Sequence, residues 1–262
     1  MIAERPTRLL GRRALLSGFG ACLLGGGTAE AVQVLRRHDH TDSENSRRRV
    51  DPTSISRVET AGDLMALTFD DGPDPDHTPT VLRVLSAAEV RATFFVIGRN
   101  ALRHPQLVRD ILADGHEVAN HTQDHRWLDR LDLASVTDQI VGAERTLAGL
   151  GAGSGGMFRP PRGWISPNVV TATRAARLRT IFWTDCLEAH LSHGIDRAIA
   201  EVSHSARPGG ILLCHDGGRL DGPNPQAIDR SATVAALPGL LRCLRARGLA
   251  ADRLSSLLEA SN

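Results

Sequence analysis

The chain has 262 residues, of which 41% are hydrophobic, and this is enough for one large domain with a packed core. Its 31 basic and 30 acidic residues give a net charge of +1, so the overall charge does not favour nucleic acid or an acidic polymer as a partner. Four cysteines, at positions 22, 186, 214 and 243, form no CxxC pair, which argues against a dense disulfide framework and a structural zinc knuckle.

Residues 1–31 are typical of an export signal. An arginine pair at 12–13 precedes an uncharged run over 14–29 and a small-x-small cleavage sequence, and the pair resembles a twin-arginine signal. The run is shorter than the roughly 20 residues that a membrane-spanning helix needs. An uncleaved anchor over 12–31, lipid attachment at Cys22 and a buried N-terminal helix stay open as alternatives. We expect an exported protein, either secreted or held at the cell envelope.

Residues 32–60 are polar and charged, and they include the basic triplet Arg47–Arg49. They offer too little apolar surface to offset the entropy of ordering, so the composition predicts a flexible linker. Residues 61–262 are then expected to form the catalytic domain.

From Leu64 onward, apolar strand-like runs alternate with amphipathic segments, which is the pattern of βα units and a mainly parallel sheet. The expected strands are 64–70, 92–97, 116–120, 157–159, 179–185 and 210–215, with a weaker one near 249–253. The expected helices are 78–89, 100–114, 133–149, 166–177, 195–206 and 231–247. So many units favour an α/β barrel, complete or not, over a small doubly wound sheet.

Several predicted strands end in side chains that can do chemistry. Asp70 and Asp71 end the first strand before a Gly-Pro break, although Asp-Asp-Gly-Pro is also ordinary turn chemistry. His121 and His125 follow the third strand, and on a helical turn their spacing would place them on one face. Such a pair also arises by chance in a chain with 11 histidines, but the carboxyl ends of parallel strands share one rim.

One aspartate and two histidines make a three-ligand metal site with a fourth position open, which is a catalytic rather than a structural arrangement. Arg159 lies in a segment stiffened by two prolines, and an inward guanidinium would hold a neighbouring carboxylate ionised. In isolation a surface loop is the simpler reading of that segment. His215 ends a further apolar strand and would face the same rim.

Four ordered segments resemble the motifs of the polysaccharide deacetylases of carbohydrate esterase family 4, also called the NodB-homology family. They are Thr68–Pro73, Asn120–His125, Arg159–Gly163 and Leu213–His215, and the resemblance spans about residues 64–258. It implies a distorted (β/α)7 barrel. It also implies removal of N-acetyl groups from a glycan such as peptidoglycan or chitin, or of O-acetyl groups from xylan.

The resemblance further implies a role for each matching residue. Asp71, His121 and His125 would hold a divalent metal, usually zinc, with Co²⁺ or another divalent ion as an alternative. Asp70 would be the general base and His215 the acid that protonates the leaving amine. The other residues expected to support catalysis or border the substrate are Arg159, Arg162, Trp183, Glu188 and Leu213.

One motif departs from the family. Its usual Asp-x-x-Asp-Trp reads Asp185-Cys186-Leu187-Glu188-Ala189 here, so either Glu188 or Asp185 could orient His215, and a substrate-walling tryptophan is missing. The expected partner is an N-acetylated glycan bound by a monomer, with no nucleic acid and with membrane association only through the N-terminal segment. An O-acetyl esterase and a carbohydrate-binding pseudoenzyme stay open as alternatives.

Overall fold

The computed structural model describes residues 51–218 and 228–261. The predicted export signal and the predicted linker up to residue 50 lie outside these ranges. Among the described residues, no helix combines the length and the apolar character that crossing a membrane requires.

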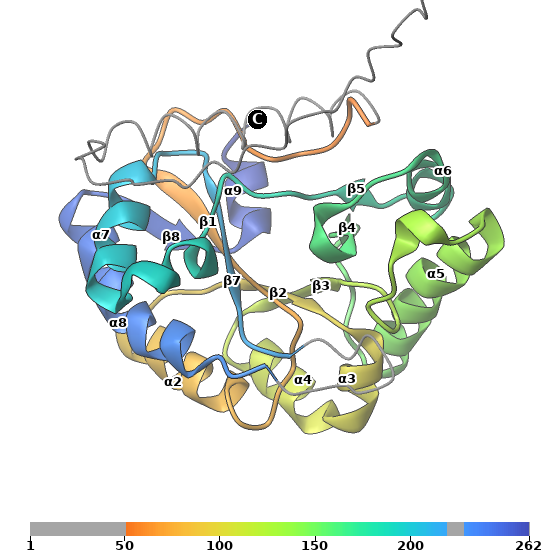
Figure 1. Cartoon of the computed structure of the whole chain (residues 1–262), viewed down its shortest axis with the longest axis horizontal. Helices are drawn as coiled ribbons and strands as arrows, with labels where there is room; N and C mark the ends of the chain where they lie inside the picture. The colour runs from red at the N-terminus through yellow and green to blue at the C-terminus, as the bar shows by residue number, and fades with distance from the viewer. Residues whose placement is uncertain (1–50, 219–227, 262) are drawn as a thin grey trace, which may run out of the picture. The chain divides into compact units, whose positions relative to one another are not determined.

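A curled sheet of parallel strands forms the centre of the described domain (Figure 1). Its order is β5-β4-β3-β2-β1-β7-β6, with β8 paired to the start of β1, and every ladder is parallel. The strands are β1 (Leu64–Asp70), β2 (Thr93–Val96), β3 (Glu117–Asn120), β4 (Met157–Phe158), β5 (Arg179–Thr180), β6 (Asp185–Cys186), β7 (Ile211–His215) and β8 (Ala250–Asp252). This confirms the prediction of a parallel α/β sheet curled towards a barrel.

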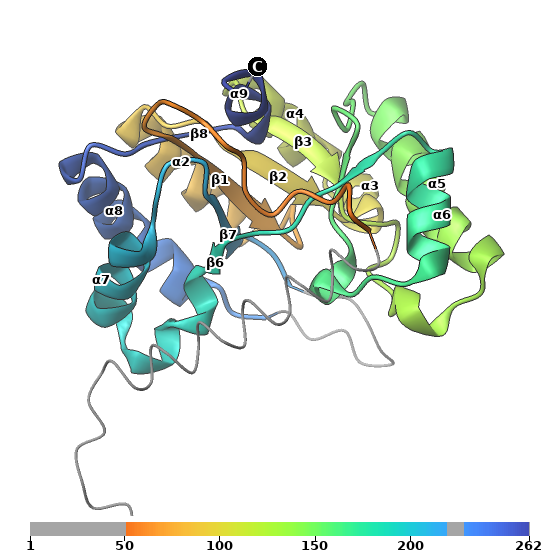
Figure 2. The same cartoon turned by 90° about the horizontal axis from the view of Figure 1, so that it is seen from above.

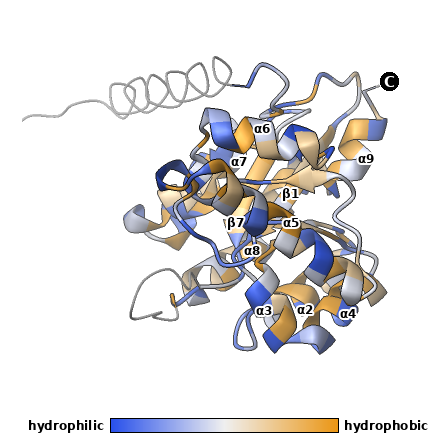
Figure 3. Cartoon of the chain, turned by 90° about the vertical axis from the view of Figure 1, so that its right-hand side faces the viewer, coloured by the Kyte–Doolittle hydropathy of each residue, from blue (hydrophilic) through white to orange (hydrophobic). Residues whose placement is uncertain are grey.

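Helices surround the sheet (Figure 2). They are α2 (Thr78–Ala88), α3 (Gly98–Arg103), α4 (Pro105–Ala113), α5 (Leu133–Gly149), α6 (Pro167–Ala175), α7 (Ile195–Ser205), α8 (Ser231–Ala246) and α9 (Leu254–Glu259). Short 3-10 turns are η1 (Leu128–Arg130), η2 (Pro161–Gly163), η3 (Leu187–Ala189) and η4 (Leu191–His193). Figure 3 shows mixed hydrophobic and hydrophilic colouring along the helices, as expected for elements with one face on the core.

Strand β1 is buried on both faces because its alternate side chains enter two different cores. Leu67 and Phe69 pack in the cluster that includes α2, α7 and α8, and Phe69 stacks on Phe94 of β2 with ring centroids 5.1 Å apart. Ala66 points into a second cluster with Phe95 and residues of α9. A period of two thus explains the near-continuous apolar run of this strand.

Two predicted elements differ from the structure, and one helix of the structure was not predicted. The expected helix 100–114 is two helices, α3 and α4, because Pro105 disfavours helical geometry at His104. The expected strand 179–185 is interrupted and forms only β5 and β6. Helix α9 was not predicted, since six residues carry too short a periodic pattern to separate a helix from a loop.

The last ten residues of the predicted linker belong to the domain. Ile55 accepts a hydrogen bond from Phe182 N at 2.7 Å and donates to Thr180 O at 2.9 Å, while Val58 donates to Gly209 O at 2.9 Å. This segment thereby joins the β5 side of the sheet to the β7 side, and no ladder between described residues pairs β5 with β6. The domain therefore begins at or before Asp51, because its first segment completes the curl of the sheet.

Candidate active site

The predicted strand-end residues meet at one rim of the sheet. Asp70 and His215 are partners in the parallel ladder between β1 and β7, and both are the last residues of their strands. Asn120 and Phe158 are partners in the same way between β3 and β4. His121 and Arg159 come directly after these two residues, so all four motifs face the same side of the domain.

Asp71, His121 and His125 form a buried group of potential metal ligands. Asp71 Oδ1 lies 3.5 Å from His121 Nε2 and 3.2 Å from His125 Nε2, and each side chain is 2% exposed. Asp71 Oδ1 accepts no hydrogen bond from any described residue. A buried carboxylate oxygen between two imidazoles without a donor is a good fit for a divalent cation, which would satisfy it.

The surroundings also keep Asp71 ionised. Burial would raise the pKa of this carboxyl, but the contact with His121 and the nearby charges of His125 and His215 hold it far below its usual range. An ionised carboxylate is the form that ligates a cation.

The two histidines do not lie on a helical turn, so that part of the prediction was wrong. They lie in the loop between β3 and η1, and Thr122 and His125 have φ values of 69° and 55°. Asn120 Oδ1 accepts a hydrogen bond from Thr122 N at 2.8 Å, and Thr122 Oγ1 accepts one from His125 N at 2.9 Å. These side-chain bonds hold a loop conformation that brings both rings to Asp71.

A backbone carbonyl sets the orientation of the His121 ring. His121 Nδ1 lies 2.7 Å from Arg159 O, and because a carbonyl only accepts, Nδ1 carries the proton. Nε2 is then the ring nitrogen that faces Asp71, and it is the one that would bind a metal.

Arg159 points inward, as predicted. It is fully buried, and its Nη1 donates to Asp70 Oδ1 at 2.6 Å and to Thr68 Oγ1 at 2.9 Å. Its guanidinium also stacks on Phe95, 4.0 Å from the ring centroid. Asp70 Oδ2 lies 3.7 Å from His121 Nε2, so this second oxygen faces the ligand group while the first is held by arginine.

His215 pairs with Glu188 and not with Asp185. Glu188 Oε2 lies 3.0 Å from His215 Nδ1, and Glu188 Oε1 accepts hydrogen bonds from His215 N at 3.0 Å and Thr233 Oγ1 at 2.7 Å. Asp185 instead contacts His190 Nε2 at 2.9 Å. The geometry thus decides between the two residues that the sequence left open.

Each member of this pair favours the charged form of the other. Burial would lower the pKa of His215, but the charge of Glu188 and its contact with Nδ1 at 3.0 Å outweigh it and raise that pKa. Burial would raise the pKa of Glu188, but the charge of His215 and hydrogen bonds with His215 and Thr233 lower it to about 2. An imidazolium beside a carboxylate is suited to act as a general acid.

The other predicted substrate residues lie around this centre. Arg162 has a φ of 60°, and its guanidinium carbon is 3.7 Å from the ring centroid of Trp127. Trp183 is partly buried against the second core cluster, with its ring 5.6 Å from the guanidinium carbon of Arg159. Leu213 is buried in β7.

The sequence did not single out three further neighbours of the ligand group. Arg230 Nη2 lies 3.2 Å from Asp71 Oδ2, and Asn100 Nδ2 donates to Asp71 O at 2.9 Å. Asp216 is buried beneath the Gly72 turn and accepts from Thr78 Oγ1, and burial raises its pKa to about 7. Asp216 could have been found by its place next to His215, whereas no local pattern marks Arg230 or Asn100.

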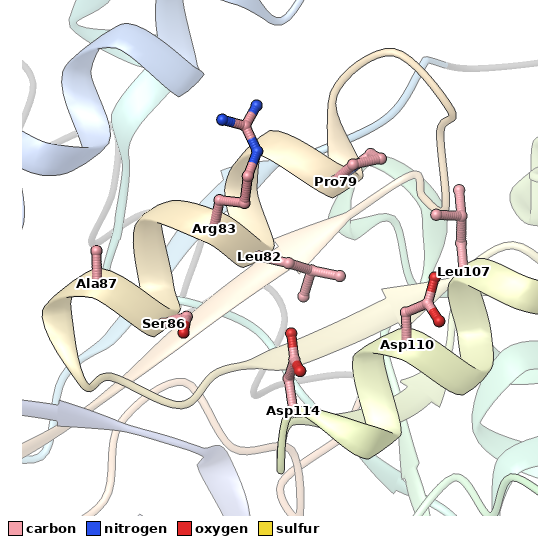
Figure 4. A pocket seen from close by; sticks show the side chains of 8 residues that line it. All are labelled: Pro79, Leu82, Arg83, Ser86, Ala87, Leu107, Asp110 and Asp114. Carbon is pink, nitrogen blue, oxygen red and sulfur yellow. The ribbon is translucent and has the colours of Figure 1, made fainter.

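A surface cavity between α2 and α4 is separate from this site (Figure 4). Leu82 and Arg83 of α2 and Asp110 of α4 are among its lining residues, and none of them belongs to the strand-end group.

The comparisons with known proteins agree with this geometry. The family model for polysaccharide deacetylase matches residues 57–181. A chitooligosaccharide deacetylase of Sinorhizobium fredii is 41% identical over 197 residues, covering 74% of this chain and 92% of that protein. A peptidoglycan-N-acetylglucosamine deacetylase of Bacillus cereus is 33% identical over 217 residues, covering 81% of this chain and 97% of that protein.

A solved structure shares the fold. The family 4 carbohydrate esterase from Streptomyces lividans, in complex with acetate, aligns with a TM-score of 0.63 and 28% identity, covering 74% of this chain and 93% of that one. The chain therefore belongs to the polysaccharide deacetylase family, the hydrolases of carbohydrate esterase family 4.

Proposed function

We propose that the protein hydrolyses N-acetyl groups on an envelope or extracellular glycan, peptidoglycan N-acetylglucosamine or a chitin-like oligomer, and releases acetate. One observation carries this proposal: a buried Asp71–His121–His125 group lies beside a separate carboxylate, Asp70, which Arg159 fixes in place. The names of the two most similar relatives described above support the choice of substrate.

We propose zinc as the metal, because two imidazole nitrogens and one carboxylate form a donor set that zinc prefers, and Co²⁺ can occupy the same set. Bound there, the cation supplies a Lewis acid that polarises the acetyl carbonyl and makes water more acidic. Asp71, His121 and His125 are the residues that would hold it.

The chain's own residues supply the proton transfers. Asp70 takes a proton from the attacking water through the oxygen that faces the ligand group, while Arg159 holds the other oxygen of this carboxylate and orients it. His215 then gives a proton to the sugar amine, which is a poor leaving group until it is protonated. A backbone amide near Arg162 is the proposed hydrogen-bond donor to the developing oxyanion, and Trp183 and Leu213 are proposed to border the acetyl group.

Export is part of this proposal. The support comes from the basic, uncharged and small-residue pattern of residues 1–31, which would deliver the domain to a glycan outside the cytoplasm. Residues 32–50 then serve as the spacer between the signal and the folded domain.

The test measures acetate release by the purified zinc-loaded protein from peptidoglycan fragments, chitin oligomers and acetylated xylan. We expect acetate from the N-acetylated substrates and its loss after chelation, with recovery when zinc is returned. Release from acetylated xylan alone would support the O-acetyl esterase instead. Absence of acetate from all three substrates would refute the proposal and favour the binding pseudoenzyme.

A further inference from the structure

A second group of metal-ligating side chains lies next to the proposed active site. Cys186, Glu188 and His215 each offer one ligand atom, and the three atoms lie within 4.8 Å of one another. All three residues are partly exposed, although His215 Nδ1 is buried and has no hydrogen-bond partner among the described residues, so a cation would reach it only after a small movement of these side chains. They come from β6, η3 and β7, and β6 pairs with β7 through Cys186 and Leu213.

Two of the three ligand-pair distances in this group are close to those of a tetrahedral metal site, and the third, between Cys186 Sγ and the His215 ring nitrogen, is at most 4.8 Å. Cys186 Sγ lies 3.4 Å from Glu188 Oε2, and Glu188 Oε2 lies 3.0 Å from His215 Nδ1. With usual zinc bond lengths, tetrahedral ligand pairs are separated by about 3.6 Å for sulfur and oxygen and about 3.3 Å for oxygen and nitrogen. Small side-chain movements would therefore bring all three atoms to bonding distance of one cation.

The donor types indicate which cations fit. A thiolate, an imidazole and a carboxylate together favour a borderline or soft divalent ion such as Zn²⁺ or Cd²⁺ over Mg²⁺ or Ca²⁺. The first ligand group, Asp71, His121 and His125, contains no sulfur. The two groups are thus chemically distinguishable, and only the second can form a metal–thiolate bond.

We propose that Cys186, Glu188 and His215 form a second, inhibitory site for Zn²⁺ or Cd²⁺. This site is weaker than the first, because the cation must displace the thiol proton and break the contact between Glu188 and His215. A cation on Nδ1 leaves His215 as a neutral imidazole, whose remaining proton is too weakly acidic to reach a leaving amine. The inhibitory effect rests on the proposed function, because it requires His215 to be the acid, whereas cation binding itself does not.

The binding test uses the full domain loaded with one equivalent of zinc and then titrated with Cd²⁺, with the ultraviolet thiolate-to-cadmium charge-transfer band as the readout. Wild type and the control variant Cys243→Ser are each expected to bind one Cd²⁺ in addition to the zinc and to show the charge-transfer band. Cys186→Ser is expected to show no band and to retain one metal. Cys243 is a suitable control because it is also partly exposed but lies on α8, outside the group.

The kinetic test measures acetate release against zinc concentration, normalised to each variant's own rate at one equivalent. We expect excess zinc to lower the rate of wild type at least about tenfold, and Cys186→Ser to need at least about tenfold more zinc for half-inhibition. A band that persists in Cys186→Ser, or that is absent from wild type, would overturn the second site. If one equivalent of zinc gives no acetate at all, the proposed function fails, while the band still decides whether the site exists.

Discussion

Replacing Glu188 by glutamine isolates the influence of this carboxylate on the proposed acid, His215. The glutamine keeps the size of the side chain and an acceptor for Thr233, but it removes the negative charge 3.0 Å from His215 Nδ1. Since that charge raises the pKa of His215, the imidazolium of the variant should lose its proton at a lower pH than in wild type.

The expected direction follows from the geometry of the pair. Charge centres about 4 Å apart attract by about 4 kcal/mol at an effective dielectric of about 20. His215 and Glu188 side chains are 19% and 18% exposed, so water screens part of this attraction. We therefore expect the pKa of His215 to fall in Glu188→Gln, because the charge that raises it is removed.

The assay is the rate of acetate release from a chitin oligomer as a function of pH, with zinc held at one equivalent. Because protonated His215 is the proposed acid, the alkaline limb of the profile should move to lower pH. In Glu188→Asp, which keeps the negative charge, the alkaline limb should lie closer to its wild-type position than in Glu188→Gln. In Asp185→Asn the limb should stay in place, since Asp185 contacts His190 and not His215. An unmoved limb in Glu188→Gln, or an equal move in Asp185→Asn, would contradict the reasoning.

Three further variants test other parts of the site. Asp70→Asn should lower turnover by about 10² to 10⁴-fold with zinc binding retained in calorimetry, and unchanged turnover would remove Asp70 as the base. His121→Ala should weaken zinc binding more than about 10-fold and reduce activity with it, whereas full activity in a zinc-loaded variant would exclude His121 as a ligand. Arg159→Met should lower the free energy of unfolding, measured in urea, by about 3 to 5 kcal/mol because it leaves buried Asp70 unpaired. Arg91→Met, which breaks the exposed pair with Asp252, should lower it by less than about 1 kcal/mol. Equal costs for the two arginine variants would contradict the expectation that leaving buried Asp70 unpaired is more costly than breaking the exposed pair.

Much of the fold could be predicted because its signals are local. The apolar run of β1 ends at two acids, and the longer helices carry periodic patterns that fix their place to within a few residues. From parallel strands alone it followed that Asp70, His121, Arg159 and His215 would share one rim, and they do.

The parts that could not be predicted depend on contacts between distant segments. Ile55 looks like part of a polar linker until Thr180 and Phe182 supply its hydrogen bonds, and short strands such as β5 and β6 carry too few residues for a pattern. The histidine loop was misread as helical because an i, i+4 spacing does not reveal the positive φ values of Thr122 and His125.

The glutamate at position 188, in the motif Asp185–Ala189 that departs from the family, bears directly on whether the protein turns over substrate. The longer side chain still brings one oxygen to His215 Nδ1, and its other oxygen is anchored by the backbone amide of His215 and by Thr233 of α8. A binding protein would need neither this pair nor the arginine-held Asp70, because sugar binding requires no proton transfer. A carboxylate lengthened by one methylene but in contact with three groups therefore still supports His215 as the proposed general acid, and this arrangement favours the deacetylase over the pseudoenzyme.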